Sequence, residues 1–121
     1  MAAKAYDAYK KNEVTTKTPG QLVVMLYDGA IKFLKQAIQS LDEGDMLQKG
    51  EKISKAIAII DELNVALDME AGGEVAQNLR ALYVYFRKQL NHANIQKDRH
   101  VIEEVMNMMQ SLGESWREIA A

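Results

Sequence analysis

The chain has 121 residues, 48% of them hydrophobic, a formal net charge of −2 and no cysteine. This composition is sufficient for one domain with a packed core. It excludes disulfides, thiol catalysis and cysteine-based metal sites, and the lack of a clustered basic block argues against nucleic acid as a partner. No apolar stretch of the sequence is long enough to span a bilayer, so we expect no membrane insertion and a cytoplasmic protein.

Residues 1–14 differ from the rest of the chain because they are mostly polar and carry two tyrosines, Tyr6 and Tyr9, about one helical turn apart. We predict a mobile N-terminal segment that can add a short helix or a cap to a bundle formed by residues 15–121. The tyrosines can anchor this segment on the bundle as a lid, or they can contact a partner directly. The two roles are compatible, since a lid can be displaced when a partner binds.

The first helix is predicted at about residues 19–41. Thr18, Pro19 and Gln21 have the spacing of an N-cap, a first helical residue and the returning side chain of a capping box. Apolar residues then recur at three- and four-residue spacing on two stripes: Leu22, Leu26, Gly29/Ala30, Phe33 and Ala37 on the first, and Val23, Tyr27, Ala30, Leu34, Ile38 and Leu41 on the second. Together they form an apolar surface wider than packing against one neighbour requires.

The same helix contains Asp28-Gly29, a dipeptide that marks a hairpin turn when strands flank it. Here helical spacing continues on both sides, so we interpret the dipeptide as part of the helix. Asp28 is expected to pair with Lys32 one turn later. Gly29 costs about 1 kcal/mol relative to alanine in a helix, which indicates that another helix approaches closely at this position.

Three further helices are predicted at about residues 46–68, 74–94 and 98–119, separated by short breaks. Asn94 is the expected left-handed residue after the third helix, and Asp98 the expected N-cap of the fourth. The predicted core stripe of the fourth helix comprises Val101, Val105, Met108, Leu112, Trp116 and Ile119. Four amphipathic helices with short connections predict an all-α fold, an antiparallel up-down four-helix bundle.

The sequence offers little support for catalysis, a metal or a cofactor. His100 and Glu104 are four residues apart, as in a solvated ion pair, and no Glu-x-x-His pair suggests a helical metal site. His92 invites comparison with four-helix phosphotransfer domains, but "HANIQ" lacks the Lys and Gly that accompany a phosphorylatable histidine there. We therefore predict a protein that is not an enzyme and has no cofactor, with phosphotransfer or small-ligand binding as the alternative.

Methionines and the wide apolar face of the first helix favour a protein-binding function. Flexible methionine side chains adapt to irregular partners, and the sequence contains Met25, Met46, Met69, Met106, Met108 and Met109 beyond the initiator. Most of these methionines are expected in the bundle core. Excess apolar surface would form a groove for a partner's amphipathic helix, or it would be buried against a second copy in a homodimer.

The sequence strongly resembles the flagellin-specific export chaperone family, FliS. The resemblance covers nearly the whole chain, through "AYDAYKKNEV", "TPGQLVVMLYDGAIKFLKQAI", "IDELNVALDMEAGGEVAQNLRALYVYFRKQLNHAN" and the closing "LGESW". One departure is Lys17, where the family usually has a small residue. The patterns are long and include loop positions, so chance similarity does not explain them.

The resemblance implies a helical bundle without enzymatic activity that binds the C-terminal region of flagellin. It further implies that binding in apolar grooves prevents premature polymerisation and that the chaperone assists delivery to the flagellar type III export apparatus. The family's N-terminal tyrosine motif corresponds to Tyr6 and Tyr9. From the apolar face of the first helix we add Met25 and Tyr27 as expected contacts with the client. A homodimer is expected, if at all, when the client is absent.

Overall fold

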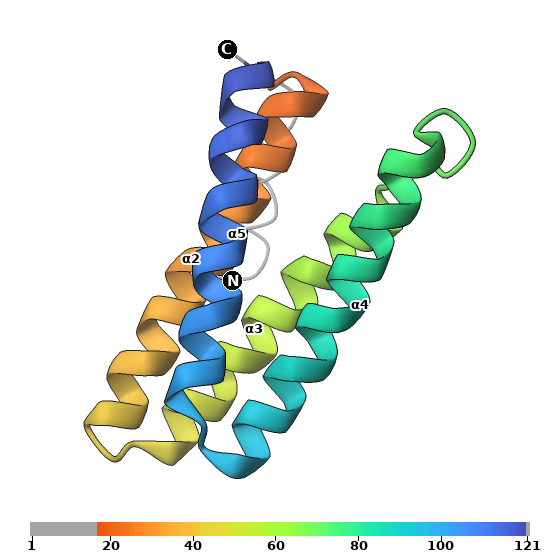
Figure 1. Cartoon of the computed structure of the whole chain (residues 1–121). Helices are drawn as coiled ribbons and strands as arrows, with labels where there is room; N and C mark the ends of the chain where they lie inside the picture. The colour runs from red at the N-terminus through yellow and green to blue at the C-terminus, as the bar shows by residue number, and fades with distance from the viewer. Residues whose placement is uncertain (1–16, 121) are drawn as a thin grey trace, which may run out of the picture.

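The computed structural model describes residues 17–120 of the chain. It contains α2 (Pro19–Asp42), α3 (Met46–Val65), α4 (Gly73–Gln96) and α5 (Arg99–Ala120), and no strand lies among the described residues. The helices run alternately in opposite directions (Figure 1). This confirms the predicted all-α fold with four packed helices. The segment 1–14 lies outside the described residues, so its mobility remains a prediction.

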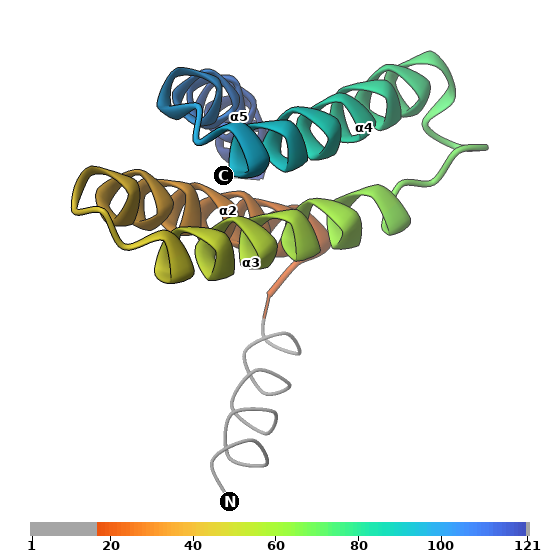
Figure 2. The same ribbon diagram turned by 90° about the horizontal axis from the view of Figure 1, so that it is seen from below.

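The four helices form two layers, with α2 and α3 in one and α4 and α5 in the other (Figure 2). α2 packs against α3 and α5, and α4 packs against the same two helices. The predicted capping box begins α2, because Thr18 Oγ1 accepts a 3.2 Å hydrogen bond from the Gln21 N–H and Gln21 Oε1 accepts a 3.0 Å bond from the Thr18 N–H. Two of the backbone donors at this helix start are thereby satisfied.

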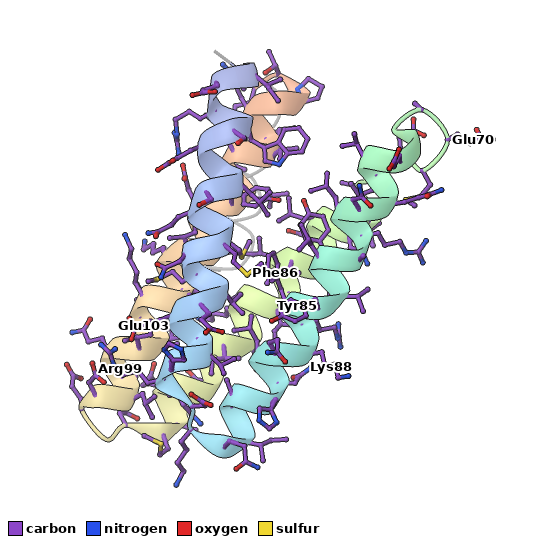
Figure 3. The ribbon with its side chains drawn as sticks, viewed as in Figure 1. Glu70, Tyr85, Phe86, Lys88, Arg99 and Glu103 are labelled. Atoms are coloured by element: carbon purple, nitrogen blue, oxygen red, sulfur yellow. The ribbon has the colours of Figure 1, made fainter. Side chains whose placement is uncertain are left out.

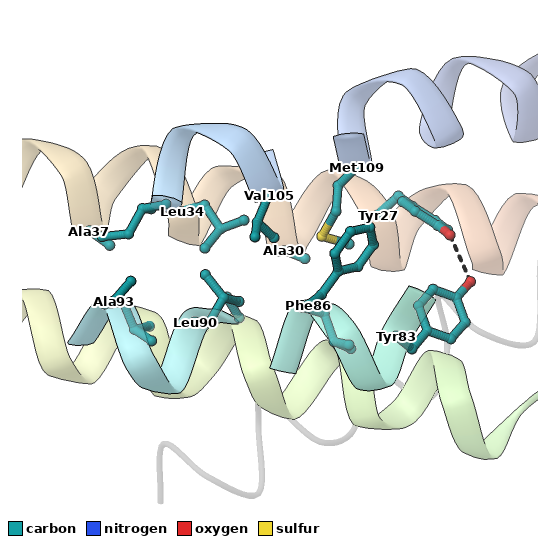
Figure 4. Packing of buried hydrophobic residues seen from close by; sticks show 14 of the residues in the cluster. Tyr27, Ala30, Leu34, Ala37, Tyr83, Phe86, Leu90, Ala93, Val105 and Met109 are labelled. Atoms are coloured by element: carbon teal, nitrogen blue, oxygen red, sulfur yellow. Dashed lines mark hydrogen bonds between the residues drawn. The ribbon is translucent and has the colours of Figure 1, made fainter. Parts of the chain in front are cut away.

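The core lies along the central axis, where large side chains from all four helices meet (Figure 4). On α2 the buried residues follow the second predicted stripe, with Tyr27, Ala30 and Leu34 fully buried. On the first stripe Leu22, Leu26, Gly29 and Phe33 remain partly exposed, whereas Ala37 is fully buried. At Gly29, an added Cβ would lie 3.3 Å from Ile59 Cδ1 of α3, a tight contact that agrees with the predicted close approach of another helix.

The core face of α5 differs from the prediction by about one residue position. The buried residues of this helix are Ile102, Val105, Met109 and Gly113. Met108, which we expected near the core, is 38% exposed, and Ile119 is 74% exposed. Both candidate stripes share Val105, so apolar spacing alone could not decide which of two adjacent faces points inward.

Two helix ends also differ from the prediction. α3 ends at Val65 rather than near 68, because Asp68 organises the following loop by accepting hydrogen bonds from the N–H groups of Glu70 and Ala71. α4 continues to Gln96, and Lys97 rather than Asn94 has the left-handed conformation, with φ of 55°. Asp98 does accept a 3.3 Å bond from the Val101 N–H, as an N-cap should.

We call the end of the bundle that contains the two short turns 43–45 and 97–98 the closed end. Here the buried Lys49 side chain of α3 donates a 2.8 Å hydrogen bond to the Asn94 carbonyl near the end of α4. The bond satisfies a carbonyl in the last turn of the helix, where intrahelical donors are lacking. Arg99 of α5 also binds both carboxylate oxygens of Asp42 at the end of α2, at 2.8 and 3.2 Å.

We call the opposite end, with the loop 66–72, the open end. At this end α4 lies apart from α5, whereas the two helices lie close together at the closed end (Figures 1 and 2). The loop is tightly constrained at Gly72, because an added Cβ would lie 2.8 Å from the Asp68 carbonyl oxygen. A larger residue at this position would therefore force the turn to shift.

Candidate functional site

An apolar groove runs along the outside of α2 and α3 near the open end. We call it the side groove; its volume is about 490 Å³, and it is lined by Leu22, Met25, Leu26, Ala58, Asp61, Glu62, Val65 and Ala66. Val65 is 85% exposed although it is a large aliphatic residue. Asp61 at the margin binds Arg87 of α4, so this carboxylate is already neutralised within the bundle.

The side groove exists because α2 has apolar residues on more of its circumference than its neighbours cover. Tyr27, Ala30 and Leu34 fill the core, while Leu22, Met25 and Leu26 lie on the side toward α3 and solvent. A second hollow of about 470 Å³ lies between α2 and α5, and Met25 lines this hollow as well. It is more polar, since Arg117 donates a 2.7 Å hydrogen bond to Asp28 Oδ1 there.

This ion pair replaces the one predicted within α2. Asp28 was expected to pair with Lys32 of its own helix, but its carboxylate binds Arg117 of α5. Both side chains are about half exposed, so the pair contributes only modestly to stability. The ion pair crosses the hollow between α2 and α5 and lies beside Met25, which lines the same hollow.

A third concavity, which we call the end pocket, opens at the open end between α4 and the other helices. Its volume is about 360 Å³, and it is lined by Val23, Leu63, Ala66, Leu67, Asp68, Ala71, Gly72, Val75, Ala76, Leu79, Tyr83 and Trp116. Ala66 lines both this pocket and the side groove. The two apolar sites are therefore neighbours, separated by the first half of α2 and the end of α3.

A buried pair of tyrosines lies next to the end pocket, which one of them, Tyr83, lines. The hydroxyls of Tyr27 and Tyr83 are joined by a 2.6 Å hydrogen bond, and their ring centroids are 6.4 Å apart (Figure 4). Burial raises the pKa of Tyr83, and its hydrogen bond with Tyr27 raises it further. Burial also raises the pKa of Tyr27, an effect that the Tyr83 and Trp116 side chains oppose. Both tyrosines are neutral at physiological pH, and they link α2 to α4 across the bundle.

The predicted site residues have different positions in the structure. Met25 lies between the side groove and the hollow beside α5, so it is placed to contact a partner. Tyr27 is fully buried, its hydroxyl is hydrogen-bonded to that of Tyr83, and it does not line the side groove. The structure therefore does not bring Met25 and Tyr27 to one surface. Tyr6 and Tyr9 lie outside the described residues, and their role remains a prediction.

Several residues of these sites were missed by reasoning from sequence. Val65 falls within the helix predicted at about residues 46–68, and neither Val65 nor Tyr83 was among the predicted site residues. The sequence signal nearest to the end pocket is the pair Gly72-Gly73, which is typical of a tight turn between helices. Lys49 was missed as well; burial lowers the pKa of this lysine, and the charge of Lys97 lowers it further.

The histidines occupy exposed positions. His92 is on the outer surface of α4, and His100 Nε2 lies 2.9 Å from Glu104 Oε1 with 81% of the histidine side chain exposed. Within residues 17–120 there is no group of three or more acidic, histidine or cysteine side chains that could hold a metal ion. No helix in that range is long and apolar enough to cross a membrane.

Comparison with known proteins identifies the family. The model of the family "Flagellar protein FliS" matches residues 2–121. The flagellar secretion chaperone FliS of Salmonella typhimurium is 43% identical over 111 residues, covering 91% of this chain and 82% of that protein. The FliS of Bacillus subtilis is 37% identical over 113 residues, covering 93% and 84%.

A solved structure has the same fold. The crystal structure of a bacterial flagellar chaperone superposes with a TM-score of 0.79 over 98% of this chain and 97% of that chain, at 18% sequence identity. At this identity the likeness concerns the fold alone, whereas the family match and the curated relatives concern nearly the whole sequence. The chain therefore belongs to the FliS family of flagellar secretion chaperones, which are not enzymes.

Proposed function

We propose that this protein is a cytoplasmic chaperone that binds the C-terminal region of flagellin, prevents its premature polymerisation and assists its delivery to the flagellar type III export apparatus. The observation that carries the proposal is the side groove, an exposed apolar channel on a chain of the FliS family. An amphipathic helix docks in such a groove through apolar side chains spaced along one face.

The physical requirements of a chaperone for an unfolded segment agree with this site. A disordered client loses conformational entropy when it binds, and it compensates by covering a large apolar surface. The side groove lies next to the end pocket, so apolar surface extends along the first half of α2 and the end of α3. Binding there would bury residues that the free chain exposes, Val65 above all.

Among the predicted contacts, we assign Met25 a direct role and Tyr27 an indirect one. Met25 lines the groove and has a flexible side chain that can adapt to the client. Tyr27 is buried behind it and sets the position of α2 through its hydrogen bond to Tyr83. Replacement of Tyr27 by alanine would damage the core, so it cannot test contact with the client.

The proposal predicts that Met25→Ala and Val65→Ser weaken binding of a C-terminal flagellin fragment by about fivefold or more each, as expected for contacts at the centre of an interface. Isothermal titration calorimetry with the purified fragment measures this. Leu47→Ser is the matched control, because Leu47 is 74% exposed but lies at the closed end. Unchanged affinity in both groove variants would contradict the assignment of the side groove.

The effect on polymerisation and the oligomeric state require separate measurements. Light scattering of flagellin should rise more slowly when the chaperone is added in equal amount, and Val65→Ser should restore part of the rise. Size-exclusion chromatography with and without the fragment tests the homodimer proposed for the free protein. A dimer that dissociates when the fragment binds would show that a second copy covers the same surface.

A further inference from the structure

Helix α4 has two lines of residues with the same spacing, one on each side. The buried line recurs every three or four residues and consists of Ala76, Leu79, Tyr83, Phe86, Leu90 and Ala93. On the side that faces away from the core the spacing recurs in a line that we call the outer seam, which comprises Ala81, Val84, Lys88, Asn91 and Ile95. All members of the outer seam are exposed. This alternation of three- and four-residue steps is the pattern along which a second helix packs.

The outer seam exposes large aliphatic side chains that the bundle core does not use. Val84 is 54% exposed and Ile95 is 77% exposed, and Tyr85 beside the seam is 43% exposed. These side chains line neither the side groove nor the end pocket. Single exposed apolar residues are common on protein surfaces, but Val84 and Ile95 share one helix face at heptad spacing. A packed helix would remove both from water, which would contribute favourably to binding.

The charge along the outer seam is positive. Residues 75–97 contain four arginine and lysine residues and no acidic residue, although the whole chain has a net charge of −2. Lys88 is the central residue of the seam and extends outward from α4 (Figure 3). Arg80 and Arg87 each lie one position before a seam residue, where a coiled coil pairs its charges. Since Arg87 already binds Asp61, we assign the attraction of an acidic group to Arg80 and Lys88.

A second copy of this chain does not fit the outer seam. Two outer seams packed against each other would bring the Lys88 side chains together near the middle of the contact, because Lys88 is the central residue of the line. Like charges in a contact that excludes water oppose association. A partner helix with acidic side chains at the matching positions replaces this repulsion with attraction, so the seam selects acidic helices against its own copy.

We propose that the outer seam of α4 docks an acidic amphipathic helix of a second protein partner, distinct from the client. The partner's apolar side chains pack on Val84 and Ile95, and its glutamate or aspartate side chains pair with Arg80 and Lys88. The side groove lies on α2 and α3, in the other layer of the bundle, so both sites can be occupied at once (Figure 2). The inference does not depend on the proposed function.

A synthetic peptide tests the proposal directly. The probe is a labelled helical peptide of about three heptads, with leucine at positions a and d and glutamate at positions e and g, where like charges keep it from pairing with itself. The control peptide has lysine at e and g. Fluorescence anisotropy should show that the unmodified protein binds the acidic peptide about tenfold or more tightly than the lysine peptide at low ionic strength. The difference should shrink in about 0.5 M salt, where exposed charges are screened.

Charge reversal on the protein tests which cations attract the peptide. The double variant Arg80→Glu/Lys88→Glu should bind the acidic peptide about tenfold more weakly and the lysine peptide more tightly than the unmodified protein does. Lys32→Glu/Lys35→Glu makes the same change in net charge at exposed positions of α2, so it is the matched control and should leave both affinities unchanged. All four positions are exposed, so these changes leave the core intact.

Serine substitutions test the apolar part of the outer seam. Val84→Ser and Ile95→Ser should each weaken binding of the acidic peptide by about threefold to tenfold. Val65→Ser is the control, because Val65 is also exposed but lines the side groove. The proposal is overturned if the acidic peptide does not bind the unmodified protein, or if the seam variants bind it as tightly as the unmodified protein does.

Two further measurements distinguish the other occupants of the outer seam. If the C-terminal flagellin fragment displaces the acidic peptide, the seam belongs to the client surface, and the proposal is overturned. If size-exclusion chromatography shows a dimer that Val84→Ser dissociates, a second copy occupies the seam, which also overturns it. A protein that binds the acidic peptide through the seam but does not bind the flagellin fragment would overturn the proposed function alone.

Discussion

The two ends of this bundle are held together by different interactions. At the closed end, Lys49 reaches the Asn94 carbonyl of α4, and Arg99 joins the start of α5 to the end of α2. At the open end the corresponding link is the buried Tyr27–Tyr83 hydrogen bond, and beyond it α4 diverges. Short polar connections bring the helices together at one end, whereas a longer loop at the other leaves apolar side chains for a partner.

The comparison indicates how one small domain can be stable and still present an apolar surface for binding. In the closed half Leu90 and Ile53 are fully buried, although Leu47 there is exposed. In the open half Val65 and Val75, which line apolar pockets, are exposed to solvent. Since burial of apolar surface stabilises a fold in proportion to the area removed from water, the free protein gives up part of this stabilisation at the open end. A bound client would recover it.

The largest expected effect comes from core leucines at the two ends of α4. Leu90→Ala should lower the free energy of unfolding by about 3–4 kcal/mol, because Leu90 is fully buried and its removal leaves a cavity. Leu79→Ala should lower it by only about 2 kcal/mol, since Leu79 already borders the end pocket. Urea unfolding followed by circular dichroism measures both. Equal losses would show that the open end is packed as tightly as the closed end.

An intermediate effect is expected at Lys49. Lys49→Met keeps an unbranched side chain but removes the donor to the Asn94 carbonyl, which should lower the free energy of unfolding by about 1–3 kcal/mol. Lys88→Met is the control, because Lys88 is exposed on α4 (Figure 3), and its effect should stay within about 0.5 kcal/mol. If the Lys49 variant were as stable as the unmodified protein, a water molecule would be able to donate the hydrogen bond to the Asn94 carbonyl equally well.

The smallest effect is expected for the tyrosine link at the open end. Tyr83→Phe removes one hydroxyl and leaves that of Tyr27 without its partner, which should lower the free energy of unfolding by about 1 kcal/mol at neutral pH. Tyr85→Phe is the control, as Tyr85 is 43% exposed. Chemical unfolding of both variants under the same conditions gives the difference.

The same link predicts a dependence on pH. Above pH 10 the tyrosines of the unfolded chain lose protons, but Tyr83 in the folded protein keeps its proton because burial raises its pKa. The folded state then binds more protons than the unfolded state, so the free energy of unfolding falls as pH rises. In Tyr83→Phe this fall should be shallower by up to about 1.4 kcal/mol per pH unit. An unchanged slope would contradict the assigned burial.

Sequence patterns predicted the helical elements of the fold well, and the details of the site less well. The capping box of Thr18 and Gln21 depends on residues three apart, and it was confirmed. The partner of Asp28 was predicted wrongly, because the competing cation, Arg117, is 89 residues away in the chain. Likewise the face of α5 was misplaced, since neighbouring helices decide which of two adjacent apolar stripes is covered.

The sequence by itself determined the four helices, their antiparallel order and membership of the FliS family, because helical periodicity, capping residues and long motifs are local properties of the chain. Only the tertiary structure decided that Tyr27 is buried while Met25 is accessible, that Lys49 caps α4, and that the end pocket opens beside Trp116. These features depend on how far helices distant in sequence approach or diverge, which no single amphipathic helix specifies.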